Sequence, residues 1–507
     1  MAKRTAIIDI GSNSARLVIF EKSSHYGFHL ICEQKSKVRI GEGAYEKEGY
    51  LQPAGIERAF LALQSFIYTI KKYRVRKTIC VATSALRDAP NGKLFVKWIK
   101  KELGLDIKII DGKQEAKFGA IAANNLLPLD NAITIDIGGG SSDMALIENG
   151  KITDTYSLNL GTVRLKELFF DKECALKEIN AKAKAFIRTE LERLPSHFRH
   201  TLAVGIGGTA RTLSKGVMKH SGHPLNKLHA FTYGVDAWHD YFERIPKSSA
   251  KGLKKFGLKK SRYDTIREGT LIFMEILSHI GAKNIISSSV GVREGVFLEQ
   301  MLRDEGLTFP KDINPSVVSI LDRFHPLIKL EQKNKGKLKI ASRLYTVMQA
   351  EIKDKKRYKK ELNWALKLSY IGELLNVYNS HQTAFYIAIQ ELNYGFKHEE
   401  ILLISSLLRM HGKELLYEPL IEEYHLLLPD ETSLQWLSFI YTLTVFLHEN
   451  SHAANIDFTY KEKTLTIRSD QPLYLAREKI KKLEKPLPFA IIIKDRNRVP
   501  RNRELGV

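Results

Sequence analysis

Two short segments of this sequence share one pattern, in which an apolar run ends in an aspartate and a turn of small residues. The run Thr5–Ile10 leads into D-I-G-S-N-S at 9–14, and Ala132–Ile137 leads into D-I-G-G-G-S at 136–141. Glycine tolerates close approach because it lacks a Cβ, and successive backbone N–H groups in such a turn can bind an anion. Each segment therefore predicts a β-hairpin whose turn binds phosphate. A third glycine-rich turn, G-I-G-G-T, follows at 205–209.

The aspartates of the two hairpins predict a metal ion. Asp9 and Asp136 would each lie beside the bound phosphate, and a carboxylate repels a phosphate unless a divalent cation lies between them. Mg²⁺ is commonly held by few carboxylates together with waters and phosphate oxygens. We therefore expect Mg²⁺, or another divalent cation, at Asp9 and Asp136, with Asp143 on the following strand as a third candidate ligand.

The spacing of apolar residues predicts two α/β domains followed by a helical one. Strand-like and helical stretches alternate across residues 1–125, which form the first predicted domain, and again across 126–305, the second. A Pro- and Gly-containing connection is expected at Arg303–Pro315. Residues 316–449 read as an all-helical domain, and 450–507 as a small α+β extension with a basic tail.

The composition favours a polyanionic partner in a reducing compartment. The 79 Lys and Arg residues exceed the 57 Asp and Glu residues and give a net charge of +22, which attracts polyanions over long distances. No targeting segment is visible, and no stretch reaches the roughly 18 apolar residues that a membrane span needs. The three cysteines form no C-x-x-C pair. We expect a cytoplasmic protein with no membrane partner.

Four motifs occur in an order that resembles the exopolyphosphatase/guanosine-pentaphosphatase (Ppx/GppA) family of the actin-like ATPase superfamily. They are I-D-I-G-S-N-S-A-R-L-V at 8–18, V-A-T-S-A-L-R-D-A at 81–89, I-I-D-G-K-Q-E-A at 109–116 and V-R-E-G-V at 292–296. The resemblance implies two actin-like (ribonuclease H-like) domains that face each other across a cleft, then an HD-like helical domain. It also implies a homodimer.

The resemblance assigns roles to single residues. Glu115 falls on the family's catalytic base, which activates a water, and Arg87 falls on an arginine that binds phosphate. Arg16 is a second cationic candidate, and Arg293 and Glu294 match family positions that fit a structural role equally well. The predicted phosphate-binding residues are Ser12, Asn13, Ser14, Arg16, Arg87, Gly138, Gly139, Gly140, Ser141, Gly208 and Thr209.

The sequence departs from the family at two places. Asp143 stands where the family often has Glu, so that a direct metal contact could become one through water. In the helical domain His381 and His411 match family positions, but the expected His-carboxylate doublet reads Ser369-Tyr370. Without those ligands a metal site is not expected there.

These patterns favour a phosphohydrolase that removes terminal phosphate from inorganic polyphosphate, guanosine pentaphosphate or both. An ATP-dependent kinase or chaperone ATPase of the same superfamily, and a non-catalytic polyphosphate-binding regulator, remain alternatives. The basic runs Lys251–Arg262 and Lys353–Lys360 are either solvated faces or a track for long polyphosphate. Nucleic acid is not expected, because aromatic residues are sparse in these runs.

Overall fold

The chain divides into two compact units. The N-terminal unit comprises Met1–Ser319 with Asn393–Phe396, and the C-terminal unit comprises Ile320–Leu392 with Lys397–Val507. The computed structural model describes residues 3–44, 47–171, 175–324, 335–354, 357–410, 415–449 and 455–495. In these ranges, no helix combines the length and apolar character needed to cross a bilayer.

The first lobe of the N-terminal unit is a five-stranded sheet in the order β3-β2-β1-β4-β5. Its strands are β1 (Lys3–Ile10), β2 (Ala15–Lys22), β3 (Phe28–Ser36), β4 (Lys77–Ala82) and β5 (Ile107–Ile109). The alternating side chains of β1 are buried on both faces of the sheet, since Ala6, Ile7 and Ile8 are all fully buried. Helices α1 (Pro53–Lys72) and α3 (Gly92–Leu103) contribute apolar residues to the core on one face.

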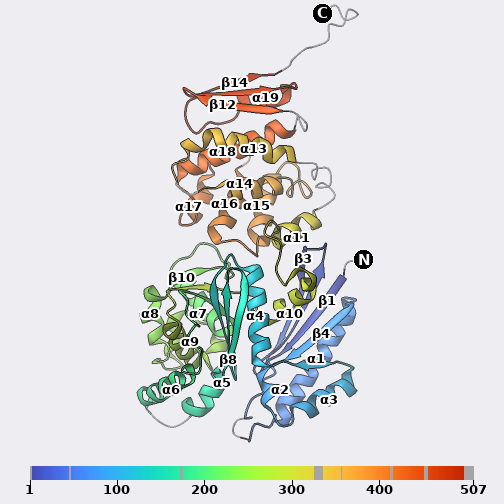
Figure 1. Cartoon of the computed structure of the whole chain (residues 1–507), viewed down its shortest axis with the longest axis vertical. Coiled ribbons are helices and arrows are strands. Elements are labelled where there is room, and N and C mark those ends of the chain that lie inside the picture. The colour runs from blue at the N-terminus through green and yellow to red at the C-terminus, as the bar shows by residue number, and fades with distance from the viewer. Residues whose placement is uncertain are drawn as a thin grey trace, which may run out of the picture. The chain divides into compact units, whose positions relative to one another are not determined.

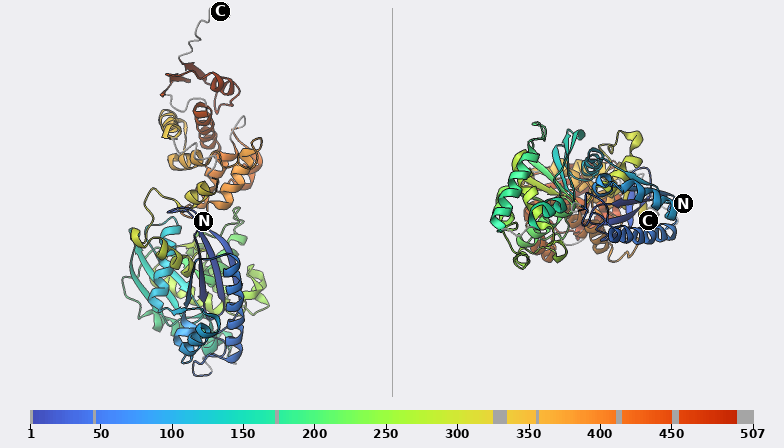
Figure 2. Two further views of the ribbon diagram at one scale, coloured as in Figure 1. Left: turned by 90° about the vertical axis from the view of Figure 1, so that its right-hand side faces the viewer. Right: turned by 90° about the horizontal axis from the view of Figure 1, so that it is seen from below.

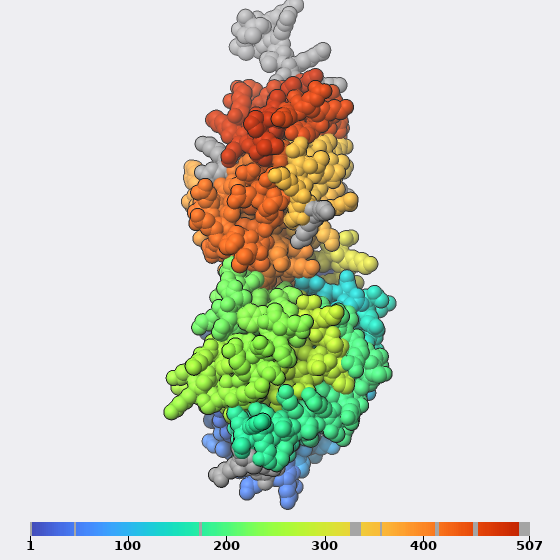
Figure 3. All heavy atoms as spheres, turned by 90° about the vertical axis from the view of Figure 1, so that its left-hand side faces the viewer, coloured from blue at the N-terminus to red at the C-terminus, as the bar shows by residue number. Residues whose placement is uncertain are grey.

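The second lobe repeats this plan with a six-stranded sheet in the order β10-β11-β9-β6-β7-β8. The strands are β6 (Ala132–Ile137), β7 (Ser142–Glu148), β8 (Lys151–Leu158), β9 (Leu202–Ile206), β10 (Thr232–Gly234) and β11 (Asn284–Ser287). Its core also contains residues of α6 (Leu176–Leu191), α7 (Gly207–His220), α8 (Val235–Arg244) and α9 (Ile266–Ile280). Of the N-terminal unit, the space-filling view in Figure 3 shows mainly this lobe, in teal to yellow-green.

Two helices, α4 (Gly112–Leu126) and α10 (Val292–Met301), pack together between the sheets (Figure 1). Their contact is close because a glycine of α10 lies on the backbone of α4: a Cβ at Gly295 would lie 1.9 Å from the carbonyl oxygen of Phe118. The two lobes lie on opposite sides of this helix pair (Figure 2). Short helices complete the lobes: α2 (Ser84–Asp88), α5 (Thr162–Leu165), the π-helix η1 (Lys166–Phe170), and the 3₁₀ turns η2 (Gly252–Phe256), η3 (Lys260–Arg262) and η4 (Arg303–Glu305).

The C-terminal unit is helical up to residue 449 and then becomes a small sheet. Its central helix α18 (Glu431–Glu449) is buried on all sides from Ser433 to His448. Strands β12 (Ile456–Lys461), β13 (Thr464–Ser469) and β14 (Ala490–Lys494) form a three-stranded sheet with helix α19 (Tyr474–Lys481). The remaining helices are α11 (Pro315–Arg323), which begins in the N-terminal unit, α13 (Lys335–Met348), η5 (Gln349–Glu351), α14 (Lys359–Leu368), α15 (Ser380–Glu391), α16 (His398–Arg409) and α17 (Glu418–Tyr424).

Candidate active site

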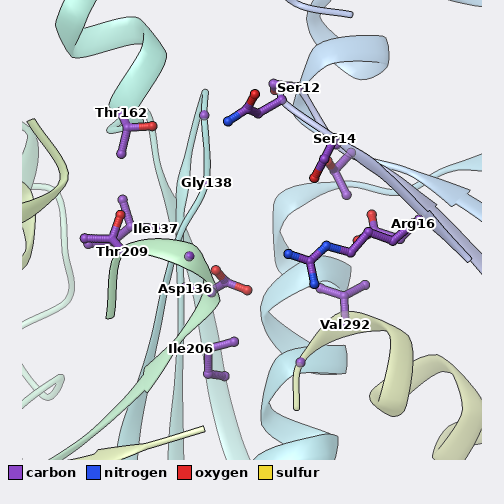
Figure 4. A pocket seen from close by; sticks show the side chains of 18 of the residues that line it. Ser12, Ser14, Arg16, Asp136, Ile137, Gly138, Thr162, Ile206, Thr209 and Val292 are labelled. Carbon is purple, nitrogen blue, oxygen red and sulfur yellow. The ribbon is translucent and has the colours of Figure 1, made fainter. Parts of the chain in front are cut away.

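A cavity of about 210 Å³ lies between the two lobes, where the glycine-rich turns converge. Three of the predicted segments line it: residues 11–14 of the first lobe, and residues 138–139 and 207–209 of the second. Figure 4 shows Ser12, Ser14 and Arg16 on one side and Thr162, Asp136 and Thr209 on the other. The turns of the two hairpins approach closely, because a Cβ at Gly139 would lie 2.9 Å from Cβ of Ser12.

The two hairpins are built in the same way. The turn of the first is closed by a hydrogen bond from the N–H of Gly11 to the carbonyl of Ser14 (3.1 Å), and that of the second by the N–H of Gly138 to the carbonyl of Ser141 (2.9 Å). Asp9 lies opposite Arg16 in the first hairpin, and Asp136 lies opposite Asp143 in the second. The equivalent position thus carries a cation in one lobe and a carboxylate in the other.

The third turn begins helix α7, whose first residues line the cavity. Gly207 has φ +77°, and a Cβ there would lie 2.1 Å from Oδ1 of Asp136, so that only glycine fits. No side chain caps the first N–H groups of α7. A helix N-terminus with free N–H groups attracts anions. Together with the two hairpin turns, Gly208 and Thr209 therefore form a wall of the cavity that is suited to an anion.

Three carboxylates line the cavity, from Asp9, Asp136 and Glu115. Burial raises the pKa of Asp9, and it raises the pKa of Asp136 to about 6, although Arg211 opposes this shift. Burial also raises the pKa of Glu115 well above its usual value, and the nearby aspartates raise it further. This concentration of carboxylates is what a divalent cation would compensate.

Asp143 does not line the cavity. Its carboxylate accepts hydrogen bonds from Ser157 Oγ (2.5 Å) and Ser141 Oγ (3.1 Å), so both of its oxygens are occupied. Burial raises the pKa of Asp143 to about 7, while the bonds from Ser157 and Ser141 act in the other direction. Any effect of Asp143 on the cavity is therefore indirect, through the residues that it contacts.

The donor set fits a magnesium ion held by two carboxylates. Within the described residues, no group of three or more His, Cys, Asp or Glu side chains is arranged to hold a metal ion. Mg²⁺ usually needs one or two carboxylates, because waters and substrate phosphates supply its other ligands. Asp9 and Asp136, from equivalent positions of the two lobes, meet that requirement.

Glu115 lies in the first turn of α4, and its Oε2 is buried without a hydrogen-bond partner. The nearest cation is Arg87, with Nη1 3.7 Å from this oxygen. Arg87 also donates to the carbonyl of Ile110 (3.2 Å) and pairs with Asp88 (3.3 Å), and it is not among the residues that line the cavity. In this structure Arg87 contacts Glu115 and the carbonyl of Ile110, and its phosphate-binding role stays a prediction.

The cavity is also lined by three cationic residues that no sequence motif indicated, Lys35, Lys37 and Arg211, and by Arg262, the last residue of the basic run 251–262. Arg211 is half-buried and donates to the carbonyls of Ser288 (2.8 Å) and Val290 (3.1 Å). Arg262 packs on the third turn, since a Cβ at Gly208 would lie 1.5 Å from its Nη2. Gly140 and Ser141, also predicted to bind phosphate, are not among the residues that line the cavity.

Arg293 and Glu294 have structural contacts. Arg293 lines the cavity and forms an ion pair with Glu33 of β3 (3.1 Å). Glu294 Oε2 accepts the N–H of Gly291 (2.7 Å), which caps the start of α10. The pair of Arg293 with Glu33 thus joins α10 to β3, and Glu294 stabilises the first turn of α10.

In the C-terminal unit, Ser369 and Tyr370 stand at the positions where the family has a metal-binding His-carboxylate doublet. Both contact a lysine. Nζ of the buried Lys337 donates to Ser369 Oγ (2.9 Å) and lies 3.9 Å from the centre of the Tyr370 ring. His381 lies in the first turn of α15 (Ser380–Glu391), whereas His411 lies outside the described residues. An ammonium group at this position is consistent with the absence of the doublet from the sequence.

The fold defines a protein with two actin-like lobes and a cavity between them. A family model described as the Ppx/GppA phosphatase family matches residues 18–304, and the chain belongs to that family. The protein is 33% identical over 307 residues to a bifunctional 3-dehydroquinate synthase/phosphatase of Fusobacterium nucleatum, which covers 58% of this chain and 46% of that relative. The match therefore spans about half the length of that relative.

Two further relatives match more of their own length. A guanosine-5'-triphosphate,3'-diphosphate pyrophosphatase of Pseudoalteromonas translucida is 25% identical, with 81% of each chain covered. Exopolyphosphatase 2 of Mycobacterium tuberculosis is 28% identical, with 45% of this chain and 74% of the relative covered.

Solved structures support the fold. The Ppx/GppA family member of Aquifex aeolicus gives a TM-score of 0.52 at 27% identity, over 60% of this chain and 99% of that one. An exopolyphosphatase of Cytophaga hutchinsonii gives 0.55 at 23% identity, over 59% and 98%.

Proposed function

We propose that this protein removes the terminal phosphate from inorganic polyphosphate, guanosine pentaphosphate or both. The observation that carries the proposal is Glu115, whose Oε2 is buried and accepts no hydrogen bond, and which lines a cavity that the three glycine-rich turns also line. Two relatives are named for these two substrates. The net charge of +22 favours a polyanion in either case.

The turns would hold the terminal phosphate through their backbone N–H groups, with Glu115 to one side. Glu115 then takes a proton from a water molecule, whose oxygen forms a bond to the terminal phosphorus. The bond from that phosphorus to the bridging oxygen breaks, and its electron pair leaves with the shortened substrate. In-line displacement of this kind depends on positioning and charge stabilisation rather than on a covalent intermediate.

The divalent cation belongs to the proposal as well. Asp9 and Asp136 would hold it, and when bound it would neutralise charge on the phosphate oxygens. The chain's own cations, Arg16, Arg293 and Arg262, would hold the remaining phosphate charge from the other side of the cavity.

The test is release of orthophosphate from long polyphosphate and from guanosine pentaphosphate, with magnesium varied, salt fixed and no other nucleotide present. We expect magnesium-dependent release from at least one substrate, and the larger kcat/KM identifies the preferred one. Strict consumption of ATP would instead establish a kinase or chaperone-type ATPase. Tight binding of polyphosphate without turnover would establish a regulator.

A homodimer and a cytoplasmic location stay predictions. Light scattering of the full chain at working concentrations tests the first, and a mass equal to one 57.8 kDa chain would contradict it.

A further inference from the structure

A row of three charged side chains crosses the sheet of the first lobe. Asp9 of β1 lies opposite Arg16 of β2, which in turn lies opposite Lys35 of β3. Directly opposed residues on antiparallel strands share one face of the sheet, with Cβ atoms about 4.5–5.5 Å apart. All three line the cavity, and β3 is the edge strand. The row therefore ends in two adjacent cations at the edge of the sheet.

This arrangement is unfavourable for the fold without an anion. Like charges directly opposite each other destabilise a sheet. Burial and the nearby cations Arg16, Arg262 and Lys37 lower the pKa of Lys35 to about 8, against the opposing effect of Glu33. Lys35 thus has an environment in which a bound anion would relieve repulsion.

Lys35 also differs from the next cations along the chain. Lys37 and Arg39 both pair with Asp264 of the second lobe, at 3.5 Å and 3.2 Å. Glu33 pairs with Arg16 and Arg293. In the part of the chain that the structure describes, no carboxylate forms an ion pair with Lys35.

The charged groups divide the cavity into two ends. Glu115 lies in the first turn of α4, the helix that follows β5, whereas Lys35 lies on β3, at the opposite edge of the sheet β3-β2-β1-β4-β5. Asp9 lies between them, on the central strand β1. In an in-line displacement the attacking water and the leaving group lie on opposite sides of the phosphorus. The cationic end therefore faces the leaving group.

We propose that Lys35 binds the leaving phosphate, the one adjacent to the cleaved bond, and that Lys37 extends this subsite along the edge of the sheet toward the following phosphates of a linear polyphosphate. The inference rests on the proposed function. As the bridging bond breaks, negative charge grows on the leaving phosphate, and the ammonium group of Lys35 stabilises it. Following phosphates compete with Asp264 for Lys37.

The test separates the leaving-phosphate subsite from the terminal one. In the Glu115→Gln background, tripolyphosphate and orthophosphate binding are measured by calorimetry for Lys35→Met, Lys35→Arg and a control. The control is Lys108→Met, an exposed lysine of β5 at the opposite edge of the same sheet. Loss of a charge-assisted hydrogen bond should weaken tripolyphosphate binding by about 10- to 100-fold in Lys35→Met. Orthophosphate binding should stay near that of the parent, and Lys35→Arg should restore tripolyphosphate binding.

Thermal unfolding distinguishes binding from a structural role. Because Lys35 faces like charges, Lys35→Met should unfold at the same or a higher temperature than the parent, whereas removal of a structural lysine would lower it. Equal weakening of orthophosphate and tripolyphosphate, or no weakening of either, would overturn the subsite.

Turnover measured without the Glu115→Gln substitution tests the Lys35 subsite and the proposed function separately. If the protein releases phosphate from polyphosphate and Lys35→Met matches Lys108→Met in kcat/KM, the subsite is wrong and the proposed function stands. If the unmodified protein neither hydrolyses nor binds any of these phosphates, both are wrong.

Discussion

Gly161 should be required for activity because it lies against the turn of the second hairpin, which we propose binds the terminal phosphate. A Cβ at this position would lie 2.2 Å from the carbonyl oxygen of Gly139 and 2.4 Å from the N of Gly140. Both contacts are with backbone, which cannot move aside as a flexible side chain can. An ordinary contact of 3.4 Å requires the carbonyl to retreat by about 1.2 Å, the difference between 3.4 and 2.2 Å. Gly161 has φ −139°, which alanine also adopts, so the effect is steric alone.

We expect Gly161→Ala to lower kcat/KM for phosphate release by about 100-fold, since a displacement of about 1 Å costs about that much in rate. Urea unfolding should show a loss of about 1–3 kcal/mol from overpacking. The control is Gly234→Ala, which also precedes a helix, has φ −77° and leaves a Cβ 4.0 Å from its nearest neighbour. If Gly161→Ala keeps kcat/KM within about threefold of the unmodified protein, the geometry of the turn does not determine the rate.

Three further predictions concern single cations. Arg87→Met should raise the pKa of Glu115, because the charge of Arg87 lowers it. The acid limb of the kcat–pH profile should therefore move to higher pH. An unmoved limb would show that Arg87 does not affect the titration of Glu115. Arg211→Met should lower the free energy of unfolding in urea by about 2–4 kcal/mol, because two buried carbonyls lose a charged donor, and an unchanged value would contradict this account. Lys35 has a pKa of about 8, so it is charged below that pH and neutral above it. Hence kcat/KM for tripolyphosphate should fall above about pH 8 in the unmodified protein. In Lys35→Arg the fall should begin at a higher pH. Identical pH profiles for the two proteins would argue against a role for the charge of Lys35.

The hairpins were predictable because each is encoded locally. An apolar run, an aspartate and a glycine turn are consecutive in sequence, and the structure forms the same turn hydrogen bond in both. The strands and helices of the two lobes follow from apolar spacing in the same way. The role of Glu115 was inferred from the resemblance, since a glutamate in the first turn of a helix is common.

The cationic end of the cavity was not predictable, because it depends on contacts between distant segments. Lys35 reaches the cavity because β3 pairs with β2 in a register that places it opposite Arg16. Arg262 belongs to a basic run whose lysines are exposed. The orientation of Asp143 depends on Ser157, which follows on the next strand. Sequence patterns identify such residue types, while strand register and packing decide which of them meet.

The central claim is that Glu115 activates the attacking water, and Glu115→Gln tests it most directly. Turnover of polyphosphate or guanosine pentaphosphate is measured together with tripolyphosphate binding, under identical magnesium and salt. We predict that kcat falls by at least about 100-fold, the usual contribution of a general base, while binding is retained. Turnover near that of the unmodified protein, with binding intact, would contradict the assignment of Glu115 as the base.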